Sequence, residues 1–390
     1  MIKSRLFVTV TALLASSLIA SCDGDPSVMS IADGPVEVDL TINPPDMMSQ
    51  IRLLDWRPDT GSFQYNDRIV PYDLNTPLFT DYALKARAVY VPEGAAIEYD
   101  ADGPLVFPVG SILIKTFYYP ADFREPDQNL TLIETRLLIN TADGWEAWPY
   151  IWNEEQTDAE LRLGGETRML SFIDSEGANQ TVSYLIPQRN QCRSCHERNV
   201  GPGGSPAISP IGPAARHLNR SYTYDSGPAN QLTHLTDLGM LTGSPDASSI
   251  PSSYDFSAAE ASDIGAIPPE DIDLAARSYL DINCAHCHDP LGTQGVTSQL
   301  FLNHDNTEAF NLGVCKRPGS AGAGTGGLTF DLVPGNPDES ILVFRIETTE
   351  VGAMMPLLGR SLQHERGAQL IRAWVAAMEP VDCSMMDIGP

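Results

Sequence analysis

Two copies of one five-residue pattern constrain this chain of 390 residues more than any other feature. Residues 192–196 read Cys-Arg-Ser-Cys-His and residues 284–288 read Cys-Ala-His-Cys-His, so both have the form C-x-x-C-H. Two residues between the cysteines place the sulfurs about one helical turn apart, with the histidine next to the second one. This spacing suits a porphyrin whose vinyl groups add to the thiols and whose iron binds the histidine. The motifs therefore predict two covalently bound haem c groups.

Each residue of the two motifs has a separate role in this interpretation. The cysteines attach the haems, and the histidines bind the irons. The residues concerned are Cys192, Cys195, His196, Cys284, Cys287 and His288. A zinc site built from all four cysteines and a thioredoxin-like redox pair are the alternatives. Both alternatives leave the histidine after each cysteine pair without a role.

The second motif lies within a longer pattern. Residues 272–280 carry apolar side chains at helical spacing and predict a helix that leads into the motif, and a similar stripe over 370–378 predicts a final helix. Between them Met355 directly precedes a proline. A helix, the motif, a long loop, Met-Pro and a terminal helix follow in this order in small class I cytochromes c. We therefore expect Met355, rather than Met354, to bind the second iron, with apolar core packing as the alternative.

The first motif has a less complete context. A run of glycine and proline over 201–206 ends any helix that begins at the motif. Met240 is our choice for the sixth ligand of the first iron, although no proline follows it. An open coordination position remains an alternative, and so do other side chains. These side chains are His217, His234 and Met169.

The other three of the seven cysteines have different expected roles. Cys315 and Cys383 form an even pair in an exported protein, which predicts a disulfide. Cys22 follows a basic start, an apolar stretch over 6–20 and small residues, which together predict a lipoprotein signal peptide cleaved before this cysteine. We expect Cys22 to carry lipid and to anchor the protein at the periplasmic face of a bacterial membrane. Asp23 slightly favours the inner membrane.

The charge of the chain restricts its partners. Lys and Arg total 24 against 51 Asp and Glu, so the formal net charge is −27. A surface of this sign repels the phosphate backbone, which excludes nucleic acid as a partner. It would instead steer the protein toward redox partner proteins with a basic docking patch.

The region before the first motif reads as β structure. Short runs of β-forming residues are separated by turns, as in a sandwich or jelly-roll. The candidate strands are 88–91, 112–119, 130–140, 145–152, 168–173 and 182–186. We therefore expect an α+β multidomain protein in which a β-sandwich or jelly-roll-like domain precedes two mainly α-helical cytochrome c-type haem domains. The expected segments are a signal peptide over 1–21, a lipidated tether over 22–50, the β-rich domain over 51–187 and haem domains over 188–267 and 268–390.

Four stretches carry a resemblance that covers most of the chain from about residue 55 onward. They are Pro71 to Phe79, Asn190 to His196, Tyr279 to His288, and Met354 to Arg360. In these stretches the chain resembles a bacterial family of exported two-haem c-type cytochromes with an N-terminal β-rich region. The resemblance implies haem binding and electron transfer, without an established substrate.

Taken together, these features predict a membrane-anchored periplasmic protein that carries single electrons between redox partners. One alternative is a peroxidase-like oxidoreductase with two haems and an open site at the first iron. The other is a ligand-binding β-domain coupled to haems that relay electrons. The sequence favours the carrier over an enzyme, because no acid–base pair for peroxide cleavage stands near the first motif.

Overall fold

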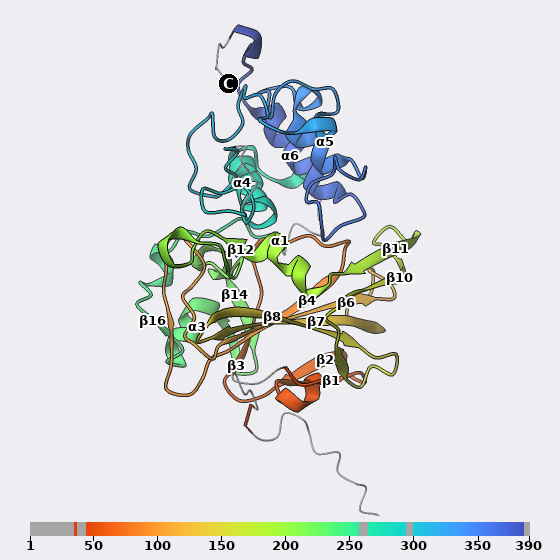
Figure 1. Ribbon diagram of the computed structural model, residues 1–390, viewed down its shortest axis with the longest axis vertical. Helices are drawn as coiled ribbons and strands as arrows, with labels where there is room; N and C mark the ends of the chain where they lie inside the picture. Colours follow the sequence, from red (N-terminus) through yellow and green to blue (C-terminus); the bar gives the residue numbers. More distant parts are fainter. Residues whose placement is uncertain (1–34, 37–43, 257–263, 294–298, 386–390) are drawn as a thin grey trace, which may run out of the picture. The chain divides into compact units, whose positions relative to one another are not determined.

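One antiparallel sheet dominates the first half of the chain in the computed structural model (Figure 1). Its strands follow one another in the order β3-β4-β6-β7-β8-β9, and each pairs with its neighbour in antiparallel orientation. The strands are β3 (Ile69–Tyr72), β4 (Leu84–Tyr90), β6 (Ile112–Pro120), β7 (Leu130–Thr141), β8 (Gly144–Trp152) and β9 (Ala159–Leu161). Valine, isoleucine and aromatic residues are frequent in these strands, as expected for a pleated and half-buried surface.

The structure describes residues 35–36, 44–256, 264–293 and 299–385. Ile31–Pro390 belong to one compact unit, and the predicted domain boundaries stay a prediction. Cys22, the predicted signal peptide and most of the predicted tether lie outside the described residues. Within those residues no helix has both the length and the apolar character needed to cross a membrane.

The two faces of the sheet bury different side chains because neighbouring residues of a strand point to opposite sides. Ile112 and Ile114 of β6 belong to a core that also contains Trp148 and Trp152 of β8. Leu113, between the two isoleucines, contributes to a separate core on the other face. The second face carries the chemistry described below, since it is the face toward the first C-x-x-C-H motif.

Short two-stranded pairings surround this sheet in the described residues. Most are antiparallel ribbons, whereas β5 and β16 pair in parallel. The pairs are β1 (Leu54–Arg57) with β2 (Ser62–Tyr65), β10 (Glu166–Ile173) with β11 (Asn179–Ile186), β12 (Glu197–Arg198) with β13 (Ala207–Ile208), β14 (Ser221–Tyr224) with β15 (Gly227–Asn230), and β5 (Ile97–Glu98) with β16 (Leu241–Thr242). Each candidate strand that the sequence predicted coincides with an observed strand, and only 88–91 runs one residue past the end of its strand, β4.

The predicted fold class is wrong. The described chain is β-rich, with six short helices, and it contains no pair of mainly α-helical haem domains. Between the first motif and residue 256 the helices are only four to seven residues long. They are α1 (Arg193–His196), α2 (Ala215–Leu218) and α3 (Gln231–Asp237). The physical reason is local: α1 ends where Glu197 becomes extended and begins β12, and the glycine and proline residues from 201 onward favour loops and β-ribbons.

The last third of the described chain has three further helices, joined by long loops. These helices are α4 (Ile272–Cys284), α5 (Ile341–Glu347) and α6 (Glu365–Ala377). The predicted helices before Cys284 and near the C-terminus are confirmed, and their apolar stripes share one core. Trp374 of α6 also donates a hydrogen bond from Nε1 to Asp273 of α4 over 2.8 Å.

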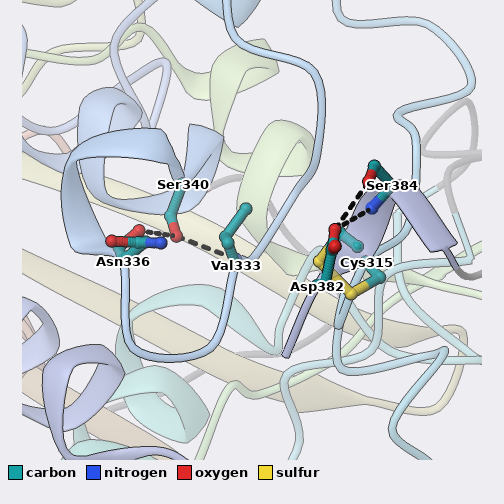
Figure 2. Close-up of a disulfide and its surroundings, with 7 residues drawn as sticks. Cys315, Val333, Asn336, Ser340, Asp382 and Ser384 are labelled. Carbon is teal, nitrogen blue, oxygen red and sulfur yellow. Dashed lines mark hydrogen bonds between the residues drawn. A yellow bond between two sulfur atoms is a disulfide. The ribbon is translucent and has the colours of Figure 1, made fainter. Parts of the chain in front are cut away.

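A disulfide joins Cys315 to Cys383, with their Cα atoms 5.0 Å apart (Figure 2). Both sulfurs are buried beside Val333. The amide of Val333 in turn donates a hydrogen bond to Ser340 Oγ over 2.9 Å. Beside Cys383, the Asp382 carboxylate accepts hydrogen bonds from Ser384 N and Oγ (Figure 2). The bond therefore ties the end of the chain after α6 to the loop that precedes α5.

Breaking this disulfide should destabilise the folded protein. The two cysteines are 68 residues apart, and in the chain-entropy model a loop of that size corresponds to about 4 kcal/mol of unfolding free energy. Urea denaturation of the oxidised protein and of the Cys315→Ser/Cys383→Ser variant measures the difference. Equal unfolding midpoints, or alkylation of both native cysteines without prior reduction, would contradict the expectation.

Candidate functional site

The first C-x-x-C-H motif is shaped by two short helical turns. Cys192 ends the 3₁₀ turn η2 (Arg189–Cys192) and caps α1, which contains Cys195 and His196. Successive helical turns keep residues three and four apart on one side. Cys192, Cys195 and His196 consequently line one cavity of about 190 Å³. The described structure leaves both thiols free of disulfides.

The cavity lies between the motif and the second face of the main sheet. Strands β4, β6, β7 and β8 contribute to its wall. The opposite wall includes the segment Pro210–Pro213, the end of α4 and the loop after Met355. Its apolar lining includes Leu113, Leu138 and Ile211. A flat, mainly apolar group with a few polar ends would suit these surroundings.

The ring of His196 is held in a defined orientation. Its Nδ1 lies 3.0 Å from the backbone oxygen of Ser209. Because a carbonyl oxygen can only accept a hydrogen bond, Nδ1 carries the proton and donates this hydrogen bond. Nε2 is therefore the nitrogen with a free lone pair, as is common for a histidine that binds a metal. Burial lowers the pKa of His196 to about 4, so the ring is neutral at physiological pH. A neutral imidazole of this tautomer can bind iron.

The second motif begins at the end of α4 and continues in a tight turn. The amides of Cys287 and His288 both donate to the Cys284 carbonyl, over 3.1 and 2.9 Å. Burial lowers the pKa of His288 to about 4, while a backbone hydrogen bond with Leu300 acts in the opposite direction. Cys284 and Cys287 are also free of disulfides in the described structure. Both thiols and the neutral imidazole thus come from consecutive turns of chain, as at the first motif.

The two motifs are in direct contact. Cys287 Sγ lies 3.5 Å from the backbone oxygen of Ser194, inside the first motif. Thr293 Oγ1 donates to the backbone oxygen of Glu197 over 3.2 Å. Next to the motifs, Arg198 forms an ion pair with Asp289 over 2.9 Å. The sequence alone does not indicate this contact, because some ninety residues separate the partners.

Met355 is held in place by its backbone. Its amide donates to the Arg345 carbonyl over 2.8 Å, and its carbonyl accepts from Arg360 Nε over 3.0 Å. The same loop is tied to the β-rich region by Asp81, whose buried carboxylate accepts hydrogen bonds from the amides of Ser361 and Leu362. Arg345 is also close enough to His288 to affect its pKa. These contacts fix the backbone of the Met355 loop, in which Pro356 and Leu358 line the cavity of the first motif.

The other proposed sixth ligands lie in different surroundings. Met240 is 2% exposed within the core that contains Leu241, and it is not among the described residues that line the cavity. His217 Nε2 lies 2.9 Å from Asp281 Oδ2, so that ring is already paired. His234 stacks on Tyr224 at 3.6 Å between ring centroids. Met169 is 68% exposed. Met240 stays a prediction, without support from the cavity lining.

The structure adds one histidine that the motif analysis treated as a spacer. His286, the third residue of the second motif, is 8% exposed and lines the cavity of the first motif. Its buried Nδ1 has no hydrogen-bond partner among the described residues. Burial, followed by the neighbouring His196 and His288, lowers its pKa to about 3. In the sequence, the one indication of a role for His286 is that a histidine occupies this position of Cys-Ala-His-Cys-His.

Comparison with protein families, with curated proteins and with solved structures finds no match for this chain. The predicted resemblance to a family of two-haem c-type cytochromes is wrong. The described structure is mostly β-sheet with few helices, and its residues contain no group of three or more His, Cys, Asp or Glu side chains that could hold a metal ion. The physical difference is that the first motif packs against a sheet, where small cytochromes surround the motif with helices.

The same finding bears on the zinc alternative. A structural zinc site gathers four cysteine or histidine ligands around one point. Within the described residues the four free cysteines do not form such a group. Each cysteine pair instead stays with its own histidine. This arrangement is compatible with a group that one histidine ligates and two thiols attach covalently.

Proposed function

We propose that this protein is an electron carrier with two covalently bound haem groups in a β-rich scaffold. Each bound haem would supply an iron that takes up and releases one electron. The observation that carries the proposal is the cavity in which Cys192, Cys195 and His196 meet, with His196 fixed in the tautomer that leaves Nε2 free. The chain thus presents two thiols and one neutral imidazole to the same enclosed space.

The roles of the residues follow from their positions. Cys192 and Cys195 attach the first haem and His196 binds its iron from one side. Cys284, Cys287 and His288 do the same at the second motif. Met355 would supply the sixth ligand of the second iron, as the Met-Pro pattern after that motif predicts, and Arg345 and Arg360 hold its backbone in place.

His286 is the side chain best placed for the sixth position of the first iron. It lines the same cavity as His196, is neutral because it is buried, and has an unpartnered Nδ1. Met240 belongs to the apolar core that also contains the cavity residues Leu113 and Leu138, but it is not itself among the described residues that line the cavity. Two histidines on one iron would give a lower reduction potential than a histidine and a methionine. The first site would then be the lower-potential site of the two.

The lining of the cavity favours a carrier over a peroxidase. Cleavage of peroxide needs a group that accepts a proton and returns it beside the iron. Among the described residues that line the cavity there is no aspartate or glutamate, and the one histidine besides His196 is His286, which as an iron ligand would not be free to move protons. If His196 and His286 both held the iron, they would also exclude small ligands from it.

The location and the partners complete the proposal. Lipid on Cys22 would hold the carrier at the periplasmic face of a bacterial membrane. The net charge of −27 would orient it toward partner proteins with a basic patch, and this attraction weakens as salt rises.

Carbon monoxide and peroxide distinguish the carrier from the enzyme. We expect the reduced holoprotein to bind no carbon monoxide and to turn over no peroxide, because both irons are six-coordinate. Optical spectra with and without carbon monoxide, next to free haem as a positive control, measure the first property. A carbon monoxide adduct combined with peroxide turnover would establish the enzyme and overturn the carrier.

A further inference from the structure

A row of three cations crosses the sheet beneath the first motif, and we propose that it binds the two propionate carboxylates of the haem held there. The row consists of Arg87, Lys115 and Arg136, from three neighbouring strands. This inference rests on the proposed function, because it identifies where the acidic edge of that haem would lie. It assigns a role to three residues outside both motifs.

The strand register places the three cations side by side. Arg87 of β4 is directly opposite Lys115 of β6, and Lys115 is directly opposite Arg136 of β7. Directly opposed like charges destabilise an antiparallel sheet. An uncompensated row of this kind is therefore unfavourable by itself and calls for anions.

One of the neighbouring rows is apolar, and the other places an aromatic ring between two charged residues. Two residues along each strand, Val89, Leu113 and Leu138 form a row that belongs to a buried core. In the other direction Phe117 lies opposite Lys85 and Glu134. Lys115 and Arg136 both contact the face of the Phe117 ring, at 5.0 and 4.4 Å from its centroid. The cations thus sit in largely desolvated surroundings, where an unpaired charge is costly.

Among the described residues, carboxylates neutralise only the two ends of the row. The fully buried carboxylate of Glu134 accepts a hydrogen bond from Arg136 Nε over 2.8 Å and another from the Tyr184 hydroxyl over 2.8 Å. Asp73 accepts Arg87 Nη1 over 2.9 Å. Arg87 Nη2 is buried without a hydrogen-bond partner.

The middle of the row has no anion of its own. Among the described residues no carboxylate lies within ion-pair distance of Lys115 Nζ. Burial, followed by Arg87, Lys85 and Arg136, lowers the pKa of Lys115 well below its ordinary value. Lys115 and the free Nη2 of Arg87 are the two donors that remain for an added carboxylate.

The row faces the place where the haem would be attached. Arg87, Lys115 and Arg136 all line the cavity shared by Cys192, Cys195 and His196. The two propionates of a haem lie together on one edge, and they carry two negative charges that the chain does not provide. A haem bound through the motif would thus present its acidic edge to this row. Among the described residues that line the cavity, no other strand residue carries a positive charge.

The test replaces Lys115 with methionine, which keeps the length of the side chain and removes its charge. Both haems are first counted in wild type and variant. The midpoint potentials of the two redox components are then measured at several pH values by optical titration. In Lys115→Met we expect one component to shift to lower potential, because a cation that favours the reduced state is gone. The same component should become pH-dependent, because a less stabilised propionate takes up a proton when the iron is reduced.

Lys85→Met is the matched control. Lys85 lies on the same face of β4, but it does not line the cavity. In Lys85→Met we expect the midpoint potentials of both redox components to equal those of the wild type. Lys115→Arg, which restores the charge at position 115, should also keep the wild-type potentials. If the methionine variant does not fold, Lys115→Gln repeats the measurement with a polar side chain.

Three results would overturn the inference, and each points to a different fault. Two bound haems with unchanged potentials in Lys115→Met would show that the row does not hold the propionates. An acetate-dependent change in the wild-type spectrum that Lys115→Met abolishes would assign the row to a carboxylate from solution. A wild-type chain without covalent haem would remove the proposed function itself.

Discussion

Replacing His286 with alanine should convert the first iron from low spin to high spin, whereas replacing Met240 with alanine should leave it low spin. The expected difference follows from position: His286 lines the cavity of the first motif, whereas Met240 belongs to the core behind this cavity and is not among the described residues that line it. Loss of an axial imidazole leaves a five-coordinate iron. Electron paramagnetic resonance of the resting protein measures the spin state of each iron separately.

Imidazole added to the buffer provides the control for this pair of variants. It should fill the position vacated in His286→Ala and restore the low-spin signal, which a merely structural defect would not allow. A high-spin signal in Met240→Ala, together with an unchanged His286→Ala spectrum, would instead make Met240 the ligand.

Replacing Cys192 and Cys195 together with alanine should remove one of the two haems. The reason is that thioether bonds hold the group to the chain, and without them only ligation by His196 and His286 remains, which unfolding breaks. Haem per chain, from absorbance after alkaline pyridine treatment, should fall by half. The Cys284→Ala/Cys287→Ala variant should give the same loss at the second motif.

The disulfide offers a matched control for the cysteine variants. Cys315→Ala/Cys383→Ala also removes two cysteines, but it should retain both haems while losing stability. Equal haem content in Cys192→Ala/Cys195→Ala and in the wild type would contradict covalent attachment at the first motif.

Local patterns predicted local structure well. The apolar spacing before Cys284 and near Trp374 indicated α4 and α6, because a helix with one buried side needs this period. The short runs of β-forming residues between turns indicated the main strands, because such residues favour a pleated, half-buried surface. The predicted helical domains had no such support. They were inferred from the motifs, and the glycine-rich stretch after His196 favours turns and short ribbons.

The candidate site divides in the same way. The cysteines and histidine of each motif can be identified from the sequence, because they lie within five consecutive residues. The cations Arg87, Lys115 and Arg136 come from three strands, and only the pairing register makes them neighbours. His286 was missed for a related reason. Its role depends on contact between two motifs that are far apart in the sequence.

The central claim is that haem is bonded covalently at both motifs, and the mass of the intact denatured chain tests it most directly. The full chain, including the predicted signal peptide, is expressed in a host that attaches haem. It is then unfolded in acid and organic solvent, which extracts any haem held only by ligation. We predict that the chain retains the mass of two haems. A chain with the bare polypeptide mass, or one that contains zinc in place of iron, would contradict the account.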